Sequence, residues 1–209
     1  AGTWRWNLPG LWEEIKTGVA KAARRGWKIE SIGVDSWALD YVLMRGGEPM
    51  LRTPYQYRDA RTAEPYERAR KRAGDERIFR CTGVQFMPIN SVYHLLADLE
   101  CDPELLRCAD RFLMIADWFH ALMTGRMVQE ESNASTTQLW DPVQRQWSEE
   151  LIRFFGLPMH IFPEVVPPGT KLGRLSAEFA REVGLSEKVI AVAGCTHDTK
   201  GSFTHGNRN

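Results

Sequence analysis

The segment Lys188-Val-Ile-Ala-Val-Ala-Gly-Cys-Thr-His-Asp-Thr199 combines the pattern of a buried strand with polar groups directly behind it. Its apolar run ends at Gly194, and His197 and Asp198 follow. In open α/β sheets, ligands bind in the crevice outside the carboxyl ends of the strands, where a carboxylate can meet a substrate without disturbing the sheet. Asp198 is therefore a candidate catalytic base. The alternative is that His197 and Asp198 only close a turn.

A second strand pattern ends in the same way. The run Ile29-Glu-Ser-Ile-Gly-Val-Asp35 is short and rich in β-branched residues, and Ser36 and Trp37 follow its carboxylate. Two such ends favour a shared crevice. If the two strands are parallel, the chain between them must include a helical crossover, and about 150 residues of mostly helical pattern lie there. Because a simple crossover is much shorter, we expect this insert to build a wall over the crevice.

Composition limits the class of protein. A chain of 209 residues with 43% hydrophobic content can bury one core, so we expect one domain with a helical subdomain. Lys plus Arg and Asp plus Glu are equal at 27 each, and no basic stripe is present. Phosphate backbones are bound by clustered positive charge, so we expect no nucleic-acid partner.

Cysteine and hydropathy patterns bear on location. The 4 cysteines lack metal-ligand spacing and a dense disulfide pattern, which is typical of a reducing compartment. No apolar run is long enough for a membrane span, and no signal segment opens the chain. We therefore expect a cytoplasmic protein with no membrane partner. His94, His120 and His160 lie in helical or proline-rich patterns without ligand spacing, so we expect no protein-only metal site.

Helix and turn signals divide the chain further. Asn7 is a candidate cap for an amphipathic helix that Gly26 can end. After the first strand, alternation from Leu39 to Leu43, the turn Arg45-Gly-Gly-Glu48 and a second arm over 50–57 predict a β-hairpin. The remaining candidate elements are helices over 62–73, 90–98, 103–109, 112–124, 148–155 and 177–183, an irregular stretch over 161–169, and a strand over 170–175. We expect residues 200–209 to form a disordered tail.

The predicted sheet is thin for a parallel arrangement. Two core strands and one hairpin are few, because parallel sheets normally need more strands and cover on both faces. Either the hairpin joins the sheet, or strands are missing from the chain.

Six stretches in order resemble the FGGY carbohydrate kinases, and within them the branch that phosphorylates L-rhamnulose. They are Ile32-Gly-Val-Asp-Ser-Trp-Ala-Leu-Asp40, Tyr57-Arg-Asp-Ala-Arg-Thr62, Thr82-Gly-Val-Gln-Phe-Met-Pro-Ile-Asn90, Asn133-Ala-Ser-Thr-Thr-Gln-Leu139, Phe162-Pro-Glu-Val-Val-Pro-Pro-Gly-Thr170 and His197-Asp-Thr199. The resemblance implies an α/β, ribonuclease H-like (actin-like ATPase) fold, incomplete here and with a large helical insertion. It also implies that residues 1–199 form part of an N-terminal sugar-binding domain.

The resemblance implies transfer of the γ-phosphoryl group of ATP to the 1-hydroxyl of a ketose, with L-rhamnulose expected, as in L-rhamnose catabolism. ATP and Mg²⁺ are the implied cofactors. Asp198 matches the family's proton acceptor, and His197 matches a substrate-binding histidine. Phosphoryl transfer depends mainly on positioning and electrostatic stabilisation, with one carboxylate that orients the hydroxyl and accepts its proton. The placement of Asp198 at a strand end agrees with this role.

Three departures from the family pattern affect the expected function. Ala38 stands where the family has a substrate-contacting glycine, so its methyl group can reshape the sugar site. No Asp-x-Gly-x-x-Ser phosphate loop precedes Trp4, and residues 200–209 diverge from the segment that leads to the family's nucleotide domain. We therefore expect an incomplete chain that is inactive alone. The alternatives are a kinase of another ketose or polyol, a non-catalytic sugar-binding domain, and a truncated reading frame without function.

Four further residues are candidates for the sugar site, each with a structural alternative. Trp37 can stack on a sugar or fill the core, and Asp35 can help to hold Mg²⁺ through water. Gln85 and Asn90 can donate sugar hydrogen bonds, although Asn90 is also a good helix N-cap. The polar run 133–138 can order a loop or line the site, and we favour the loop because such side chains readily bond nearby backbone.

Overall fold

The computed structural model describes residues 2–197, so Asp198 and the expected tail over 200–209 lie outside the described residues. The helices are α1 (Leu8–Ala23), α2 (Ala63–Ala73), α3 (Asp75–Thr82), α4 (Ser91–Cys101), α5 (Pro103–Cys108), α6 (Ile115–Thr124), α7 (Glu131–Thr136), α8 (Glu149–Phe155) and α9 (Ala177–Val183), with the short 3₁₀ turns η1 (Ala60–Thr62) and η2 (Met159–Ile161). The strands are β1 (Ser31–Ile32), β2 (Tyr41–Arg45), β3 (Glu48–Pro49), β4 (Arg111–Met114), β5 (Gln129–Glu130), β6 (Trp140–Asp141), β7 (Gln146–Trp147), β8 (Val165–Val166), β9 (Thr170–Arg174) and β10 (Ile190–Ala193).

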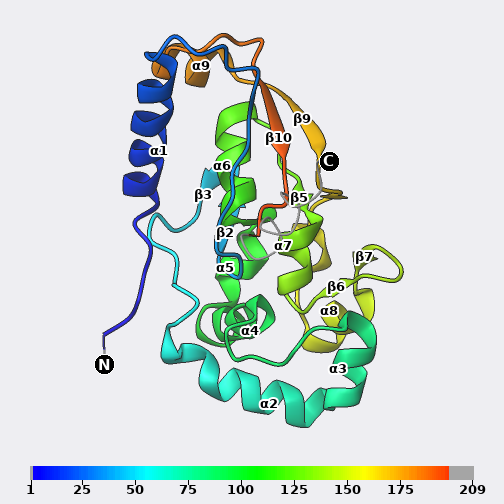
Figure 1. Cartoon of the computed structure of the whole chain (residues 1–209). Coiled ribbons are helices and arrows are strands. Elements are labelled where there is room, and N and C mark those ends of the chain that lie inside the picture. The colour runs from blue at the N-terminus through cyan, green and yellow to red at the C-terminus, as the bar shows by residue number, and fades with distance from the viewer. Residues whose placement is uncertain (1, 198–209) are drawn as a thin grey trace.

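The two strands that frame the predicted crevice are neighbours and run parallel. Ser31 pairs with Ile190 and Ile32 with Ala191, while β9 pairs antiparallel on the other side of β10. Apolar residues of α1, α6 and α9 pack with β10 into one core cluster. Figure 1 shows α1 and α9 together at one end of the molecule, with β10 running from there toward α7. The chain between β1 and β10 supplies the crossover that parallel pairing requires. It also supplies α6 and α9, which pack on β10.

The predicted turn joins two antiparallel strands, but the second arm expected over 50–57 is wrong, because β3 covers only Glu48–Pro49. The hairpin lies in a different sheet from β10. Strands β2 and β3 pair antiparallel, and β4 pairs with the other edge of β2. The expectation of a helix from residue 112 is therefore wrong for Phe112–Met114, which forms most of β4. A continuous apolar run fits a buried strand and a buried helix equally well. Pairing with Tyr41–Met44 decides for a strand, and α6 begins only at Ile115.

Helices α2 to α5 and α8, which we call the helical insert, lie at the opposite end of the molecule from α9 (Figure 1). Its core is the largest cluster of buried side chains, drawn from α3, α4, α5, α8 and the strands beside them. The expected helix ends at Gly125, Gly156 and Gly184 are confirmed, each glycine adopting the left-handed conformation. Helices α3 and α7 were not predicted. No helix within residues 2–197 is both long and apolar enough to cross a membrane.

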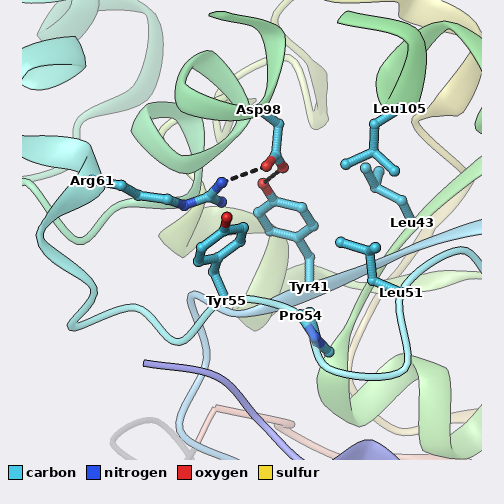
Figure 2. A pocket seen from close by; sticks show the side chains of 8 residues that line it. All are labelled: Tyr41, Leu43, Leu51, Pro54, Tyr55, Arg61, Asp98 and Leu105. Carbon is cyan, nitrogen blue, oxygen red and sulfur yellow. Dashed lines mark hydrogen bonds and ion pairs between the residues drawn. The ribbon is translucent and has the colours of Figure 1, made fainter. Parts of the chain in front are cut away.

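A buried polar cluster, which we call the wall cluster, ties the hairpin to the insert (Figure 2). Arg61 of η1 forms an ion pair with Asp98 of α4 at 2.5 Å, and the Tyr41 hydroxyl of β2 donates a hydrogen bond to the same carboxylate at 2.5 Å. The Arg61 guanidinium lies 3.7 Å from the ring centroid of Tyr55. Burial, followed by the charge of Asp98, raises the pKa of Tyr41 well above its usual value. The wall cluster thus joins β2, η1 and α4 to one another, away from the ends of β1 and β10.

Candidate functional site

The two predicted strand ends meet. Beyond the β1–β10 ladder, the Ser36 amide donates to the Thr196 carbonyl at 3.0 Å, and Ser36 and His197 form a parallel bridge. Asp35 is exposed at this edge. The two strand ends inferred from the sequence therefore lie side by side, with His197 on one and Asp35 and Ser36 on the other. Asp198 follows His197 in sequence but lies outside the described residues.

A buried carboxylate that the sequence analysis missed holds the second strand end. Glu130 is completely buried, and its Oε2 accepts hydrogen bonds from the Thr196 amide at 3.1 Å and the Thr196 hydroxyl at 2.8 Å. The Asn133 side chain donates to the Thr196 hydroxyl at 2.6 Å, and the His197 amide donates to the Ser132 hydroxyl at 3.3 Å. No local pattern could have identified Glu130, because its partner Thr196 is 66 residues away.

Asn133 and Ser132 therefore form hydrogen bonds with the second strand end, at Thr196 and His197. The polar run 133–138 was expected to order a loop, and its start instead lies in α7. Asn133 bonds both the hydroxyl and the carbonyl of Thr196. Later in the run, the Thr136 and Thr137 hydroxyls donate to backbone carbonyls 3 residues earlier, as local ordering predicts.

Helix α6 supports the first strand end. The Val34 amide donates to Nε2 of buried His120 at 3.1 Å, so that nitrogen is the acceptor and the ring proton is on Nδ1 when His120 is neutral. Asp117, one turn earlier, accepts from the Glu130 amide at 3.1 Å. Burial raises the pKa of Asp117 to about 6, while its contacts with His120 oppose that rise. Thus α6 holds Val34, next to the first strand end, and the backbone of Glu130, whose side chain holds the second strand end.

Trp37 and Ala38 lie in a strained turn after the first strand. Ala38 is buried and has φ of 61°, and Leu39 has φ of 69°. This left-handed region is open to glycine but costs other residues roughly 1–2 kcal/mol. The family glycine expected at position 38 would therefore relieve strain as well as remove a methyl group.

Asp40 fixes the Trp37 ring from the end of this turn. Its Oδ2 accepts from the indole nitrogen of Trp37 at 2.6 Å and from that of Trp6 at 2.7 Å. The two indole rings pack at a centroid separation of 4.4 Å, and Trp37 is half-buried. Burial raises the pKa of Asp40 to about 7, although both indole hydrogen bonds oppose the rise. Trp37 thus has a fixed edge and one face packed on Trp6.

The remaining two candidates differ in burial. Gln85 is exposed on the loop between α3 and α4. Asn90 is buried at the N-cap position of α4, yet its side chain does not cap the helix. Its oxygen accepts from the Met87 amide at 2.9 Å, and its nitrogen donates to the Thr136 carbonyl at 3.1 Å. Asn90 therefore joins the 83–90 loop to α7. The adjacent Ser91 hydroxyl donates to the Leu39 carbonyl at 2.6 Å, which brings α4 against the Ala38 turn.

An open hollow of about 510 Å³ lies beside the first strand end. It is lined by Leu11, Glu14, Ile15 and Val19 of α1, by residues 32–37, and by Phe119 and Met123 of α6. Most of this lining is apolar, and Asp35 and Ser36 provide polar groups at one end. A polyol would find hydrogen-bond partners mainly at that end.

Residues 2–197 contain no group of three or more His, Cys, Asp or Glu side chains placed to hold a metal ion. His94 is buried, and burial followed by the charge of Arg61 lowers its pKa to about 3, so it is a neutral core histidine.

Comparisons with known proteins agree with this arrangement. The family model "FGGY family of carbohydrate kinases, N-terminal domain" matches residues 1–203. A rhamnulokinase of Halalkalibacterium halodurans is 37% identical over 95% of this chain and 42% of its own length. A rhamnulokinase of Pectobacterium atrosepticum is 38% identical over 93% of this chain and 38% of its own length. The chain therefore spans about 40% of the length of these relatives.

Solved structures match the fold. A ligand-bound xylulose kinase from Lactobacillus acidophilus superposes with a TM-score of 0.87 at 16% identity, over 94% of this chain and 40% of that one. A glycerol kinase from Plasmodium falciparum with ADP gives a TM-score of 0.73 at 19% identity, over 88% of this chain and 38% of that one. The expected ribonuclease H-like (actin-like ATPase) fold is confirmed, with this chain forming part of it. Together with the match over residues 1–203, this places the chain in the FGGY family of carbohydrate kinases.

Proposed function

We propose that the protein carrying this chain is an ATP-dependent carbohydrate kinase that phosphorylates the 1-hydroxyl of a ketose, with L-rhamnulose as the first candidate. The main support is the junction of the two strand ends, where the Ser36 amide meets the Thr196 carbonyl and His197 lies in register with Ser36. The relatives that are 36–38% identical and named rhamnulokinase support the choice of sugar.

In this proposal Asp198 is the catalytic base and His197 binds the sugar. Asp198 accepts the proton of the 1-hydroxyl as that oxygen attacks the γ-phosphorus, and the bond to the bridging oxygen of ADP breaks. Further sugar contacts are assigned to Trp37, Ala38 and Asp35, and at the other side of the crevice to Gln85 and Asn90. The side-chain amide of Asn90 already makes two internal hydrogen bonds. A sugar contact would therefore use the donor and acceptor positions that remain on that amide.

The proposed division of labour assigns sugar binding to residues 1–199 and phosphate holding to the rest of a longer protein. ATP is the second substrate, and Mg²⁺ is proposed to arrive with its phosphates, since the described residues form no metal cluster. The chain alone is accordingly proposed to be inactive, and the protein to act in the cytoplasm. No nucleic acid or membrane is part of the proposal.

Ala38 supports one alternative within the same family. Its buried methyl group stands at a strained position where the sugar is proposed to approach the backbone. A kinase of a different ketose or of a polyol is therefore the second candidate, and a sugar-binding domain without turnover is the third.

A panel of sugars separates these functions. The full-length protein is assayed for ATP-dependent phosphorylation of L-rhamnulose, other ketoses and glycerol. The Asp198→Asn variant should lower kcat by at least 10²-fold while sugar affinity stays within a few-fold, because the base contributes mainly in the transition state. A wild-type protein that binds sugar without turnover would support the third candidate, and a full-rate Asp198→Asn variant would remove Asp198 from its role.

A further inference from the structure

Glu130 does more than begin a helix. It is the N-cap of α7, and its Oε1 accepts from the Ser132 amide at 2.8 Å while its Oε2 accepts from the Asn133 amide at 3.4 Å. A short side chain such as Ser, Asp or Asn normally suffices for this task. Glu130 has a longer reach, and that reach brings Oε2 to Thr196, which follows the end of β10 at Ala193.

The hydrogen bonds at Thr196 form one connected network in which each donor and acceptor can be named. The Thr196 amide and hydroxyl both donate to Glu130, and the hydroxyl in turn accepts from Asn133. The Ser132 hydroxyl donates to the Glu130 carboxylate and accepts from the His197 amide. The Thr196 carbonyl accepts from Ser36, on the first strand end. Glu130, Ser132, Asn133 and Thr196 are each buried.

The Glu130 carboxylate accepts five hydrogen bonds in this arrangement. Glu130 receives the amides of residues 132, 133 and 196 and the hydroxyls of residues 132 and 196, and every one of these groups is a donor. A glutamine would direct its two N–H groups at donors on one side. A buried donor that loses its acceptor is penalised by the full desolvation of that group.

We propose that Glu130 is a positioning residue that fixes Thr196 and His197, the two residues that precede Asp198 in the sequence, against the Ser36 edge. The inference rests on the proposed function, because it gives the held segment its chemical purpose. A small misplacement of a reacting group lowers turnover steeply, by roughly 10²-fold for about 1 Å.

The test uses the full-length protein and two sets of variants. Glu130→Gln keeps the size and removes the charge, and we expect kcat to fall by about 10²-fold with a much smaller rise in the KM for the sugar. Thr196→Val removes the hydroxyl that joins Glu130 to Asn133 and should also lower kcat. Thr196→Ser retains that hydroxyl and should recover the larger part of the turnover.

Asp98→Asn is the matched control. Asp98 is also a buried carboxylate with a tyrosine hydroxyl and a guanidinium as donors, but it belongs to the wall cluster. Its replacement should lower the melting temperature and leave kcat unchanged. If Glu130→Gln lowers kcat no more than Asp98→Asn does at equal folded fraction, the positioning role is wrong.

Amide hydrogen exchange makes the inference independent of activity. In Glu130→Gln we expect faster exchange at Thr196 and His197, with unchanged exchange in α4 and β2. Absence of any wild-type turnover would refute the proposed function, whereas unchanged exchange at Thr196 and His197 would refute the positioning role itself. If Glu130→Gln does not fold, the difference between Thr196→Val and Thr196→Ser decides, and equal turnover of these two overturns the inference.

Discussion

Single residues set the shape of the proposed sugar site, and Ala38 does so by conformation as well as by size. Its φ of 61° belongs to a region where L side chains are strained, and its methyl group is buried. Ala38→Gly relieves that strain but loses the buried methyl and adds chain entropy in the unfolded state. The opposing effects leave stability within about 1 kcal/mol of the wild type.

The expected effect of Ala38→Gly is therefore on the sugar. With the methyl group removed, the backbone can approach a ligand more closely, and we expect the KM for L-rhamnulose to fall several-fold in the full-length protein. Arg145→Gly is the control, since Arg145 also has a positive φ, of 51°, at an exposed turn. It should leave KM unchanged. Equal KM values for Ala38→Gly and wild type, for every sugar that is turned over, would contradict a role for Ala38 in specificity.

Asp40 gives the chain a pH-dependent stability with a defined sign. Burial raises its pKa from 3.8 to about 7, so the folded chain binds the proton more tightly than the unfolded chain. The stabilisation from this proton is complete below pH 4 and is lost as the pH rises through 7. Asp40→Asn cannot ionise, yet its oxygen can accept from both indoles. The free energy of unfolding of the wild type relative to Asp40→Asn should therefore fall by up to about 4 kcal/mol between pH 4 and pH 8.

Urea unfolding followed by tryptophan fluorescence measures this difference. Asp75→Asn is the control, because exposed Asp75 has its pKa lowered by Arg70 and should give a small change of the opposite sign. Parallel pH profiles for wild type and Asp40→Asn would contradict the buried, proton-binding state of Asp40.

Residue roles were predictable from the sequence only where the partner is close in the chain. Asn7 accepts from the Gly10 amide as a cap should, three residues away. Asn90 has the sequence position of a cap, but its side chain bonds Thr136, 46 residues on. Glu130 had no signal at all, because its function depends on Thr196. Tertiary contacts thus decide the use of a polar side chain whose local pattern fits several uses.

Whole elements were easier to predict than their pairing. Helix ends at Gly125, Gly156 and Gly184 follow from local backbone conformation, and all three are confirmed. The run from Phe112 was assigned to a helix, since a short apolar stretch carries no period that separates strand from helix. Its pairing with β2 depends on residues about 70 positions earlier. The two similar strand ends favoured a shared crevice and left parallel pairing as a condition, and β1 and β10 do pair in parallel.

The β1–β10 contact depends on a glycine. A Cβ at Gly33 would lie 3.1 Å from the Val192 carbonyl oxygen, a backbone atom that cannot move without disturbing the ladder. Gly33→Ala should destabilise the chain by about 1–3 kcal/mol. Gly18→Ala is the control within α1, where a Cβ would meet nothing within 4 Å. It should stabilise by roughly 0.5–1 kcal/mol.

Thermal unfolding followed by circular dichroism compares the two glycine variants. The expected order of melting temperatures is Gly18→Ala, wild type, Gly33→Ala. A Gly33→Ala variant as stable as wild type would mean that the two strand ends are less closely joined than their hydrogen bonds indicate.

At the scale of the molecule, the buried hydrophobic side chains of the described residues form three clusters. The largest belongs to the helical insert and the strands beside it, a second joins α1, α6 and α9 to β10, and a third lies between α1, α6, β2 and β4. The ordered motifs predicted the family and its fold, because they are spread along the whole match. They did not predict that the hairpin would pair with β4, since no motif contains that contact.

The division of the molecule leads to a prediction for the chain of 209 residues by itself. Its insert contains a complete buried cluster, so it should show a cooperative unfolding transition. We nevertheless predict no ATP-dependent phosphorylation of L-rhamnulose by this chain, because it spans about 40% of the length of its rhamnulokinase relatives and phosphate holding is proposed to lie in the rest of the protein. A coupled assay of ADP release compares it with the full-length protein at equal concentration, with Asp198→Asn of the full-length protein as background. Turnover by the 209-residue chain above that background would contradict the assignment of phosphate holding to the rest of the protein, and would place the complete reaction within these residues.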